Sequence, residues 1–434
     1  MLRLSIIFIV IFNFFVLNSY ANDNDKSIQQ EAYSLQDLCK IALKLSESVK
    51  IAEEDVYMAN LIKKKTFAAL VPSFSTFIGY STNFGTASMS SDWGASWGVR
   101  FDQSFSLSRR ELGAYYVSDE YIKKSNYDLE SLKATYLLQV SSDYYNVLKA
   151  KRGVDIADIN VKRLEKHKES VNARLKMETA TKLDLLRVNA ELSMAKTVLI
   201  NADNNLRLAK SIIQRNLNLS PDYKLLEPKF SDNILIDSFN FEDLKKSALN
   251  SRTELKSLNS QKFISEALVE WDKGALWPTV SVEGLYQYND GRPKAFFDDH
   301  DSFSIGLNLN FLFFDGGMRK AEINESQSRK RKVDFALEET IKLITIEIEQ
   351  AYLEVIREKN IVDALSDQLK YVKENYEAVT QQFKYGLADS IDVMEANSLL
   401  STTERELSDS KYNLELSILK LKKAEGLLIS ELTR

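Results

Sequence analysis

The chain of 434 residues contains little cysteine, histidine, proline or glycine. With one cysteine, Cys39, no internal disulfide can form, and Cys39 with His167 and His300 offers too few ligands for a usual zinc site. The 14 glycines and 5 prolines are few enough to permit long uninterrupted helices. Acidic and basic residues nearly balance, 62 against 57, so the composition shows no sign of a nucleic-acid-binding surface.

Long hydrophobic runs are also scarce, and the longest, residues 4–17, lies close to the N-terminus. Ser19 and Ala21 place small residues where a signal peptidase cuts, so we predict a signal peptide at residues 1–21 and a short N-terminal segment at 22–33. The alternative is an uncleaved anchor, but the run is short for a spanning helix. The mature protein is therefore expected outside the cytoplasm.

The sequence contains two related halves. A constant offset pairs similar residues of the two halves: Leu38 with Leu244, Pro72 with Pro278, Ser75 with Ser281 and Tyr80 with Tyr286. Such an offset indicates an internal repeat. We predict a first structural repeat at 34–220, a linker at 221–239, a second repeat at 240–429 and a C-terminal tail at 430–434.

Each repeat is expected to contain a helix of moderate length, two strands and two long helices. The stretch FSIGLNLNFLFF, residues 303–314, alternates apolar and polar side chains, as a strand with one apolar face does. We place the strands at about 72–107 and 278–314, with the least regular alternation just after Pro72. Apolar heptads in the later stretches predict coiled coils. A helix over 109–176 would be about 100 Å long, which suits a rod or the wall of a tube.

The apolar faces of these strands contact either lipid or a small protein core. The helices already bury their apolar stripes against one another, and aromatic residues gather near the strand ends, as they do at membrane interfaces. These two observations favour lipid. Four strands are too few to close a barrel, and an open edge in lipid would leave backbone groups without hydrogen bonds. Transmembrane strands would therefore require several chains to share one barrel.

Several motifs in this order resemble the TolC-like outer membrane efflux family over nearly the whole mature chain. They are LFFDGGMRKAEI at 312–323, METATKLDLLRVNAEL at 177–192 and YGLADSIDVMEANSLL at 385–400. The resemblance implies a mainly α-helical protein with a transmembrane β portion. Three chains, with four strands each, would form a twelve-stranded β-barrel continuous with an α-barrel of coiled-coil helices.

The same resemblance implies a passive exit duct in the outer membrane of a Gram-negative bacterium, with most of its mass, including residues 22–33, in the periplasm. Its partners would be a second and third copy of the chain, outer-membrane lipid, a periplasmic adaptor (membrane fusion) protein and an inner-membrane pump of the RND or ABC type. Drug efflux and type I protein secretion are both consistent with the motifs.

The hairpins of long helices are expected to turn at Glu178 and Gly386, because glycine readily takes a positive φ. By resemblance to the family, Asp392 and Glu395 would form a pore constriction at the periplasmic end, with Asp184 as a weaker candidate. The alternative is that these acids only stabilise the starts of helices.

The same resemblance suggests adaptor docking at three residues of the turns: Met177, Gly386 and Leu387. The alternative is that these residues serve only the geometry of the turns. Family members often carry a basic residue where this chain has Ala388, and that residue helps to hold the duct closed. The resemblance therefore does not identify the contact that would hold this duct closed.

The remaining polar residues suggest no chemistry. His167 lies between two lysines and is predicted to be a solvated helix residue. No spacing of serine, histidine and acid supports catalysis, and no cofactor is implied, so an enzyme is the least favoured class. The structural alternative to a duct is a periplasmic coiled-coil scaffold without a pore.

Overall fold

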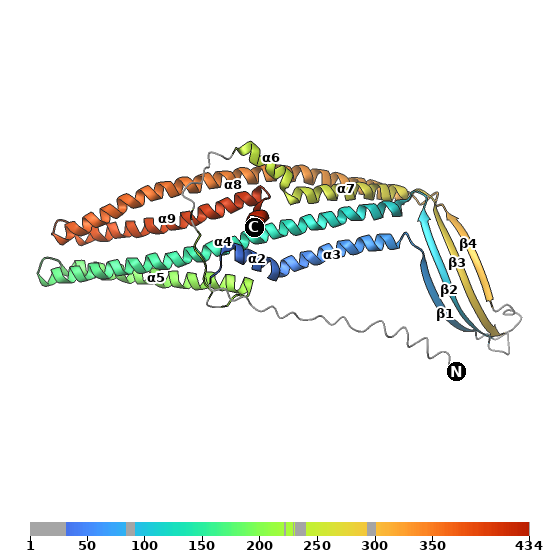
Figure 1. Cartoon of the computed structure of the whole chain (residues 1–434), viewed down its shortest axis with the longest axis horizontal. Helices are drawn as coiled ribbons and strands as arrows, with labels where there is room; N and C mark the ends of the chain where they lie inside the picture. Colours follow the sequence, from blue (N-terminus) through green and yellow to red (C-terminus); the bar gives the residue numbers. More distant parts are fainter. Residues whose placement is uncertain are drawn as a thin grey trace.

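The computed structural model describes residues 32–83, 92–220, 223–228, 230, 240–292 and 301–433. The predicted signal peptide, His300 and most of the predicted linker lie outside the described residues. The molecule is elongated, with long helices side by side and a sheet that extends beyond one end of them (Figure 1). No helix within the described ranges is long and apolar enough to cross a bilayer.

The first half runs through six elements: α2 (Leu35–Leu45), α3 (Glu47–Ala68), β1 (Ser73–Asn83), β2 (Asp92–Ser106), α4 (Arg110–Lys176) and α5 (Lys182–Leu217). The second half runs through six matching elements and a short last helix: α6 (Phe241–Ser251), α7 (Thr253–Gly274), β3 (Thr279–Arg292), β4 (Asp301–Asn310), α8 (Met318–Lys384), α9 (Ser390–Ala424) and α10 (Leu428–Leu432).

The two halves repeat each other in detail. The longest helices, α4 and α8, both contain 67 residues. The shorter helices are interrupted at equivalent residues, Ser46 between α2 and α3 (φ −59°, ψ 121°) and Arg252 between α6 and α7 (φ −57°, ψ 122°). The same backbone path is therefore used twice.

The four strands form one antiparallel sheet in the order β1-β2-β3-β4, as the fold prediction required. Its register places apolar side chains on one face and mostly polar side chains on the other. Phe303, Ile305 and Leu307 of β4 are 70–72% exposed, so no part of the described chain covers the apolar face there. The alternation in β1 is irregular because its two phenylalanines lie on opposite faces of the sheet. Phe74 lies on the apolar face, and Phe77, which pairs with Gly98, lies on the polar face.

The predicted end of the last strand is wrong. β4 ends at Asn310, which pairs with Thr279, and residues 311–314 leave the sheet. The neighbouring strand β3 begins only after Pro278, which lacks an N–H, so no partner extends past Asn310. Alternation alone does not reveal that the partner strand is shorter.

The turn from β4 into α8 is held by Asp315 and Arg319. Arg319 Nε donates to Asp315 Oδ2 at 2.6 Å, and the Gly317 N–H donates to Asp315 Oδ1 at 3.0 Å. These hydrogen bonds, that of the Arg319 side chain above all, lower the pKa of Asp315 to about 2. Arg319 Nη1 also donates to the carbonyl of Ala275 at 3.1 Å, which ties this turn to the end of α7.

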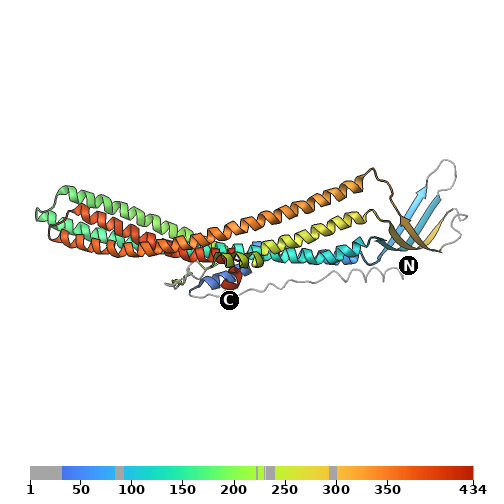
Figure 2. The same ribbon diagram turned by 90° about the horizontal axis from the view of Figure 1, so that it is seen from above.

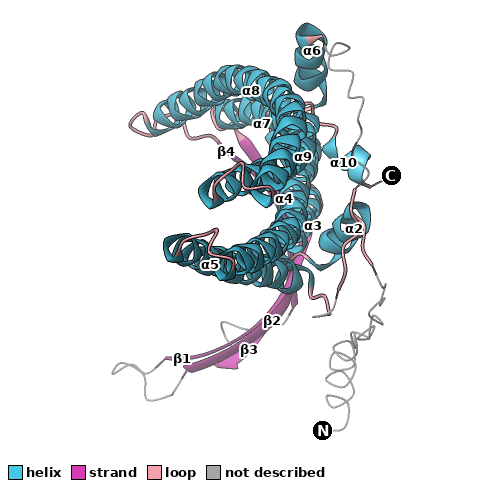
Figure 3. Cartoon of the chain, turned by 90° about the vertical axis from the view of Figure 1, so that its left-hand side faces the viewer, coloured by secondary structure: helices cyan, strands magenta, loops and turns pink. Residues whose placement is uncertain are grey.

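The helices pack through apolar seams and together form a curved wall. One buried cluster lies where α4 meets α2, α5 and α10, and another where α8 meets α6 and α9. Seen end-on, the long helices form an arc with α8 and α5 near its two ends, and α2, α6 and α10 lie on the convex side (Figure 3). The side view shows the sheet continuing from the far end of this wall (Figure 2).

Candidate functional site at the hairpin tips

The two hairpin turns lie together at the end of the molecule opposite the sheet (Figure 1). In the first turn Glu178 takes φ 58°, and the Thr179 N–H donates to the Arg174 carbonyl at 2.9 Å. In the second turn Gly386 takes φ 80°, and the Leu387 N–H donates to the carbonyl of Gln382 at 2.9 Å. Both turns therefore use the same left-handed helix ending, at the positions predicted from the sequence.

Asp184 and Asp392 occupy equivalent places just after these turns. The Thr181 N–H donates to Asp184 at 2.9 Å, and the Asp389 N–H donates to Asp392 at 2.8 Å. Each carboxylate is thus the third helical residue of a capping box. The Thr181 hydroxyl and N–H lower the pKa of Asp184 by hydrogen bonding to its charged form.

Asp184 and Asp392, two of the three predicted constriction acids, therefore have a structural role at the start of a helix. Asp392 and Glu395 are both exposed on α9, one turn apart, whereas Asp184 on α5 is half-buried. Capping uses one oxygen of Asp392 and none of Glu395, so both side chains still present negative charge to solvent.

The predicted docking residues lie at the extreme tip. Met177 is 65% exposed and Leu387 77% exposed, and Gly386 is exposed beside them. Tyr385, which the sequence did not single out, is 80% exposed next to Gly386. The two turns together therefore present apolar side chains to solvent at the point farthest from the sheet.

Arg174 joins the two hairpins at their tips. Its Nη1 donates to the carbonyl of Phe383 at 3.0 Å, and its guanidinium lies 4.6 Å from the centre of the Phe383 ring. Its Nη2 also donates to the Thr179 carbonyl at 3.3 Å. Ala388 is half-buried and packs against an apolar cluster of Val171, Val188, Phe383 and Val393. A cation from the other hairpin thus bridges the tips.

The prediction for His167 is wrong. The residue is 8% exposed, and its Nε2 lies 2.9 Å from Ser390 Oγ at the start of α9. Its ring also lies 5.0 Å from that of Phe383. Burial lowers the pKa of His167, because a charged ring loses hydration there. The missed signal was helical spacing, since His167 follows Leu164 by three residues and precedes Val171 by four, and both of these are buried.

Polar contacts continue along the boundary between the hairpins, from α4 to α9. Arg163 donates to both carboxylate oxygens of Glu404, at 2.7 and 3.0 Å. Asn160, one turn before Arg163 on α4, accepts a hydrogen bond from Asn397 Nδ2 at 2.6 Å. By contrast, α4 and α5 meet through apolar residues such as Leu164. The packing within the first hairpin is therefore mainly apolar here, whereas its boundary with the second hairpin combines these polar contacts with a buried apolar cluster of Val171, Val188, Phe383 and Val393.

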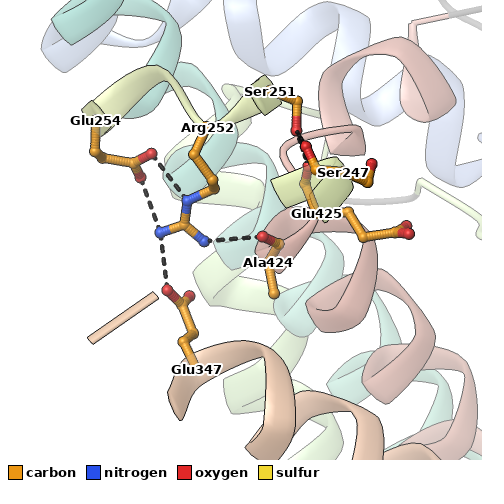
Figure 4. A network of polar contacts seen from close by, with 7 residues as sticks. All are labelled: Ser247, Ser251, Arg252, Glu254, Glu347, Ala424 and Glu425. Carbon is orange, nitrogen blue, oxygen red and sulfur yellow. Dashed lines mark hydrogen bonds and ion pairs between the residues drawn. The ribbon is translucent and has the colours of Figure 1, made fainter. Parts of the chain in front are cut away.

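The base of the second hairpin is anchored by a buried arginine (Figure 4). Arg252 is 6% exposed and contacts Glu347 of α8 at 2.8 Å and Glu254 at 3.0 Å. It also donates to the carbonyl of Ala424 at 3.3 Å. Its equivalent in the first half is the serine at the break between α2 and α3, so the anchor is specific to the second half. Nothing in the local sequence indicates these partners, which lie far along the chain.

Among the described residues no group of histidine, cysteine, aspartate and glutamate is arranged to hold a metal.

Comparison with known proteins agrees with this architecture. Residues 244–427 match the family described as outer membrane efflux protein. The outer membrane protein TolC of Vibrio cholerae serotype O1 is 19% identical over 385 residues, 83% of each chain. The alkaline protease secretion protein AprF of Pseudomonas aeruginosa is 21% identical over 335 residues, 75% of this chain and 67% of AprF. The Campylobacter jejuni CmeC outer membrane channel has the same fold, with TM-score 0.81 and 17% identity over 94% of both chains.

Proposed function

We propose that the chain belongs to the TolC-like outer membrane efflux proteins and that three copies of it form a passive exit duct of a tripartite efflux or type I secretion system. In this proposal the sheets of three chains close a barrel in the outer membrane, and the helical arcs close a tube in the periplasm. AprF, by its name, serves protease secretion. The proposal covers a duct for secreted proteins and one for small molecules.

The uncovered apolar face of the sheet carries this proposal. Phe303, Ile305, Leu307 and Leu309 are 64–72% exposed in the single chain, and the apolar residues of β1 to β3 extend the same face. The outer edges of β1 and β4 have no strand partner in the described part of the chain. Lipid would cover the face, and neighbouring copies would pair the edges, because unpaired backbone groups are not tolerated in lipid.

The edges of the helical arc support the same assembly. Near one end of the arc, α5 exposes Leu186 and Met194, and near the other end, α8 exposes Leu343, Ile346 and Leu353. Exposed apolar stripes at both edges of a curved wall suit contact with the opposite edge of another copy. A closed ring would bury both stripes at once.

A periplasmic scaffold without a pore is the second candidate. It would require the chain's own helices to cover the apolar face of the sheet. The sheet instead extends away from the helix ends (Figure 1), so the observed arrangement favours the duct.

In the proposed duct the hairpin tips form the periplasmic entrance. Asp392 and Glu395 would line its narrowest part, and three copies would place six carboxylates around one hole, which favours cations. The exposed Met177, Gly386 and Leu387 would contact the periplasmic adaptor, which links the duct to an inner-membrane pump of the RND or ABC type. No step of this transport requires chemistry by the chain.

Assembly and conductance test the proposal. We expect the full-length protein to fractionate with outer membranes, to need detergent for extraction, to run as a heat-resistant trimer and to form discrete channels in planar bilayers. A monomer that is released by carbonate and stays folded without detergent would refute the duct and support the scaffold.

A further inference from the structure

Four residues on the polar face of the sheet form what we call the exit band: Phe77, Arg100, Asp102 and Glu283. We infer that, in the proposed duct on which this inference rests, the exit band is a second selectivity filter inside the β-barrel, separate from the hairpin tips. It would admit small cationic and neutral solutes in preference to polyanions, and Phe77 would limit their size.

The strand register brings the exit band together on one face. Asp102 of β2 pairs directly with Glu283 of β3. Two residues farther along β2, Arg100 pairs with Ser75 of β1. Side chains two apart on one strand point to the same face, so Arg100 lies on the side of both acids. Apart from Asp92 at the far end of β2, these are the only charged residues at the described strand positions that share the phase of Asp102.

Phe77 lies on this polar face, although its type suits the opposite one. It pairs with Gly98, and a Cβ added at Gly98 would lie 2.7 Å from Phe77 Cζ and 2.3 Å from the carbonyl oxygen of Tyr286. Such distances are closer than atoms tolerate, so the ring needs glycine beneath it. Glycine at this position therefore gives an aromatic ring a place on the side that faces the proposed lumen.

The charged side chains of the exit band do not neutralise one another through ion pairs. Like charges placed directly opposite on neighbouring strands destabilise a sheet, yet Asp102 and Glu283 occupy such a pair. Arg100 is exposed, and within the described ranges none of the three forms an ion pair. Unfavourable local choices that lack a structural benefit are typical of functional sites.

The chain direction orders the exit band along the transport path. β1 starts from helix α3 and β2 returns to helix α4, so an outgoing solute meets the acids first, then Arg100, then Phe77. A barrel of twelve strands is larger than the small barrels filled by side chains and smaller than open porins. Long inward side chains therefore narrow its lumen, and each chain adds two negative charges against one positive charge.

Charge substitutions in planar bilayers test the filter. Asp102→Asn with Glu283→Gln should lower the cation-to-anion permeability ratio, while Arg100→Gln should raise it. We expect changes of up to about fivefold, the effect of one unit charge near contact distance in water. Ser104→Ala, a neutral change on the same face, is the matched control and should leave the ratio unchanged. A general structural defect would not change the permeability ratio in opposite directions in the two charge variants.

Cysteine modification tests the position of the ring in assembled channels. Phe77→Cys and its neighbour Ile78→Cys differ in the face they use, since Ile78 is 88% exposed on the apolar face. Burial raises the pKa of the native Cys39 thiol to about 12, so it should not react. A membrane-impermeant methanethiosulfonate reagent should reduce conductance through Phe77→Cys channels and leave Ile78→Cys channels unchanged.

The outcomes separate the filter from the duct itself. If the wild-type protein forms no channels, the proposed function fails. If channels form but neither charge variant shifts the reversal potential, the filter is refuted and the duct stands. Should the charge variants fail to assemble, Ser75→Cys serves instead, because positive and negative reagents can be attached after assembly. These reagents must then shift selectivity in opposite directions, and equal responses would overturn the inference.

Discussion

Among the side chains at the hairpin contact, His167 is the one whose charge changes most with pH near neutrality. Burial between α4, Phe383 and Ser390 favours its neutral form and lowers its pKa. The opened state, with an ordinary pKa of about 6.5, binds the proton more strongly. Stability of the closed contact is therefore complete above about pH 6.5 and falls as the pH drops below that value.

We predict that acidification loosens the tips through His167. Hydrogen exchange of the backbone amides in residues 174–179 and 383–387 should accelerate between about pH 7.5 and pH 5.5, after correction for intrinsic rates. His167→Gln stays neutral and keeps a partner for Ser390, so its corrected exchange should not change with pH. An equal response of the wild type and His167→Gln would contradict the prediction.

Substitutions of the acidic residues at the tips can distinguish a role in helix capping from a role in the pore. Asp392→Asn retains an oxygen that can accept the Asp389 N–H, so the helix start should survive. Together with Glu395→Gln it removes six charges from three copies. We predict intact trimers with lower cation selectivity in planar bilayers. Asp184→Asn, the equivalent change at the half-buried site, is the comparison and should have a smaller effect. Unchanged selectivity in the double variant would exclude the proposed constriction.

The strands are elements whose two faces meet different surroundings in the proposed barrel. Leu307 and Asn308 are neighbours in β4 and point to opposite faces of the sheet. Arginine at Leu307 would enter lipid, at a cost of about 2–4 kcal/mol near the bilayer centre. Arginine at Asn308 would face the wet lumen.

This difference predicts that Leu307→Arg lowers the yield and heat resistance of trimers, while Asn308→Arg leaves both near the wild-type values. Gel mobility of unheated and heated samples measures the effect. If the two substitutions behaved alike, or if Asn308→Arg were the more damaging, the assignment of the two faces would be reversed or wrong.

The contacts within each helical hairpin differ in chemical character from the contacts between the two hairpins. Apolar seams hold α4 to α5 and α8 to α9. The boundary combines polar contacts from Arg163, His167 and Arg174 with a small apolar cluster at the tips. Polar contacts exchange readily for water, whereas apolar seams resist separation. If the tips part, each hairpin should therefore move as a unit, with Arg252 retaining the base of the second hairpin.

The assembled trimer depends on contacts that a single chain leaves open. Leu353 of α8 is 55% exposed near one edge of the arc. Burial of a leucine side chain contributes about 1.5–3 kcal/mol, and a trimer contains three such positions. We predict that Leu353→Glu shifts the protein from trimer to monomer in detergent, as measured by light scattering.

Leu353→Met provides the control, because it keeps an apolar side chain of similar volume at the same position. It should leave the trimer intact. Equal dissociation of both variants would point to a general defect of α8, and full retention of the trimer in Leu353→Glu would place the contact between copies elsewhere.

Local periodicity was enough to determine much of the architecture from the sequence. Alternation located the four strands, heptads located the long helices, and the constant offset between halves located both hairpin turns. These features are repetitive, and neighbouring residues specify them together. The polar side of β4 follows from the same alternation.

Only the tertiary structure decided which distant groups meet. The end of β4 depends on where Pro278 allows its partner strand to begin, and the burial of His167 depends on a hairpin more than two hundred residues away. Arg174 and Arg252 likewise find their partners across space. Hydrogen bonds and desolvation act over a few ångströms in three dimensions, and spacing along the chain carries no record of such distances.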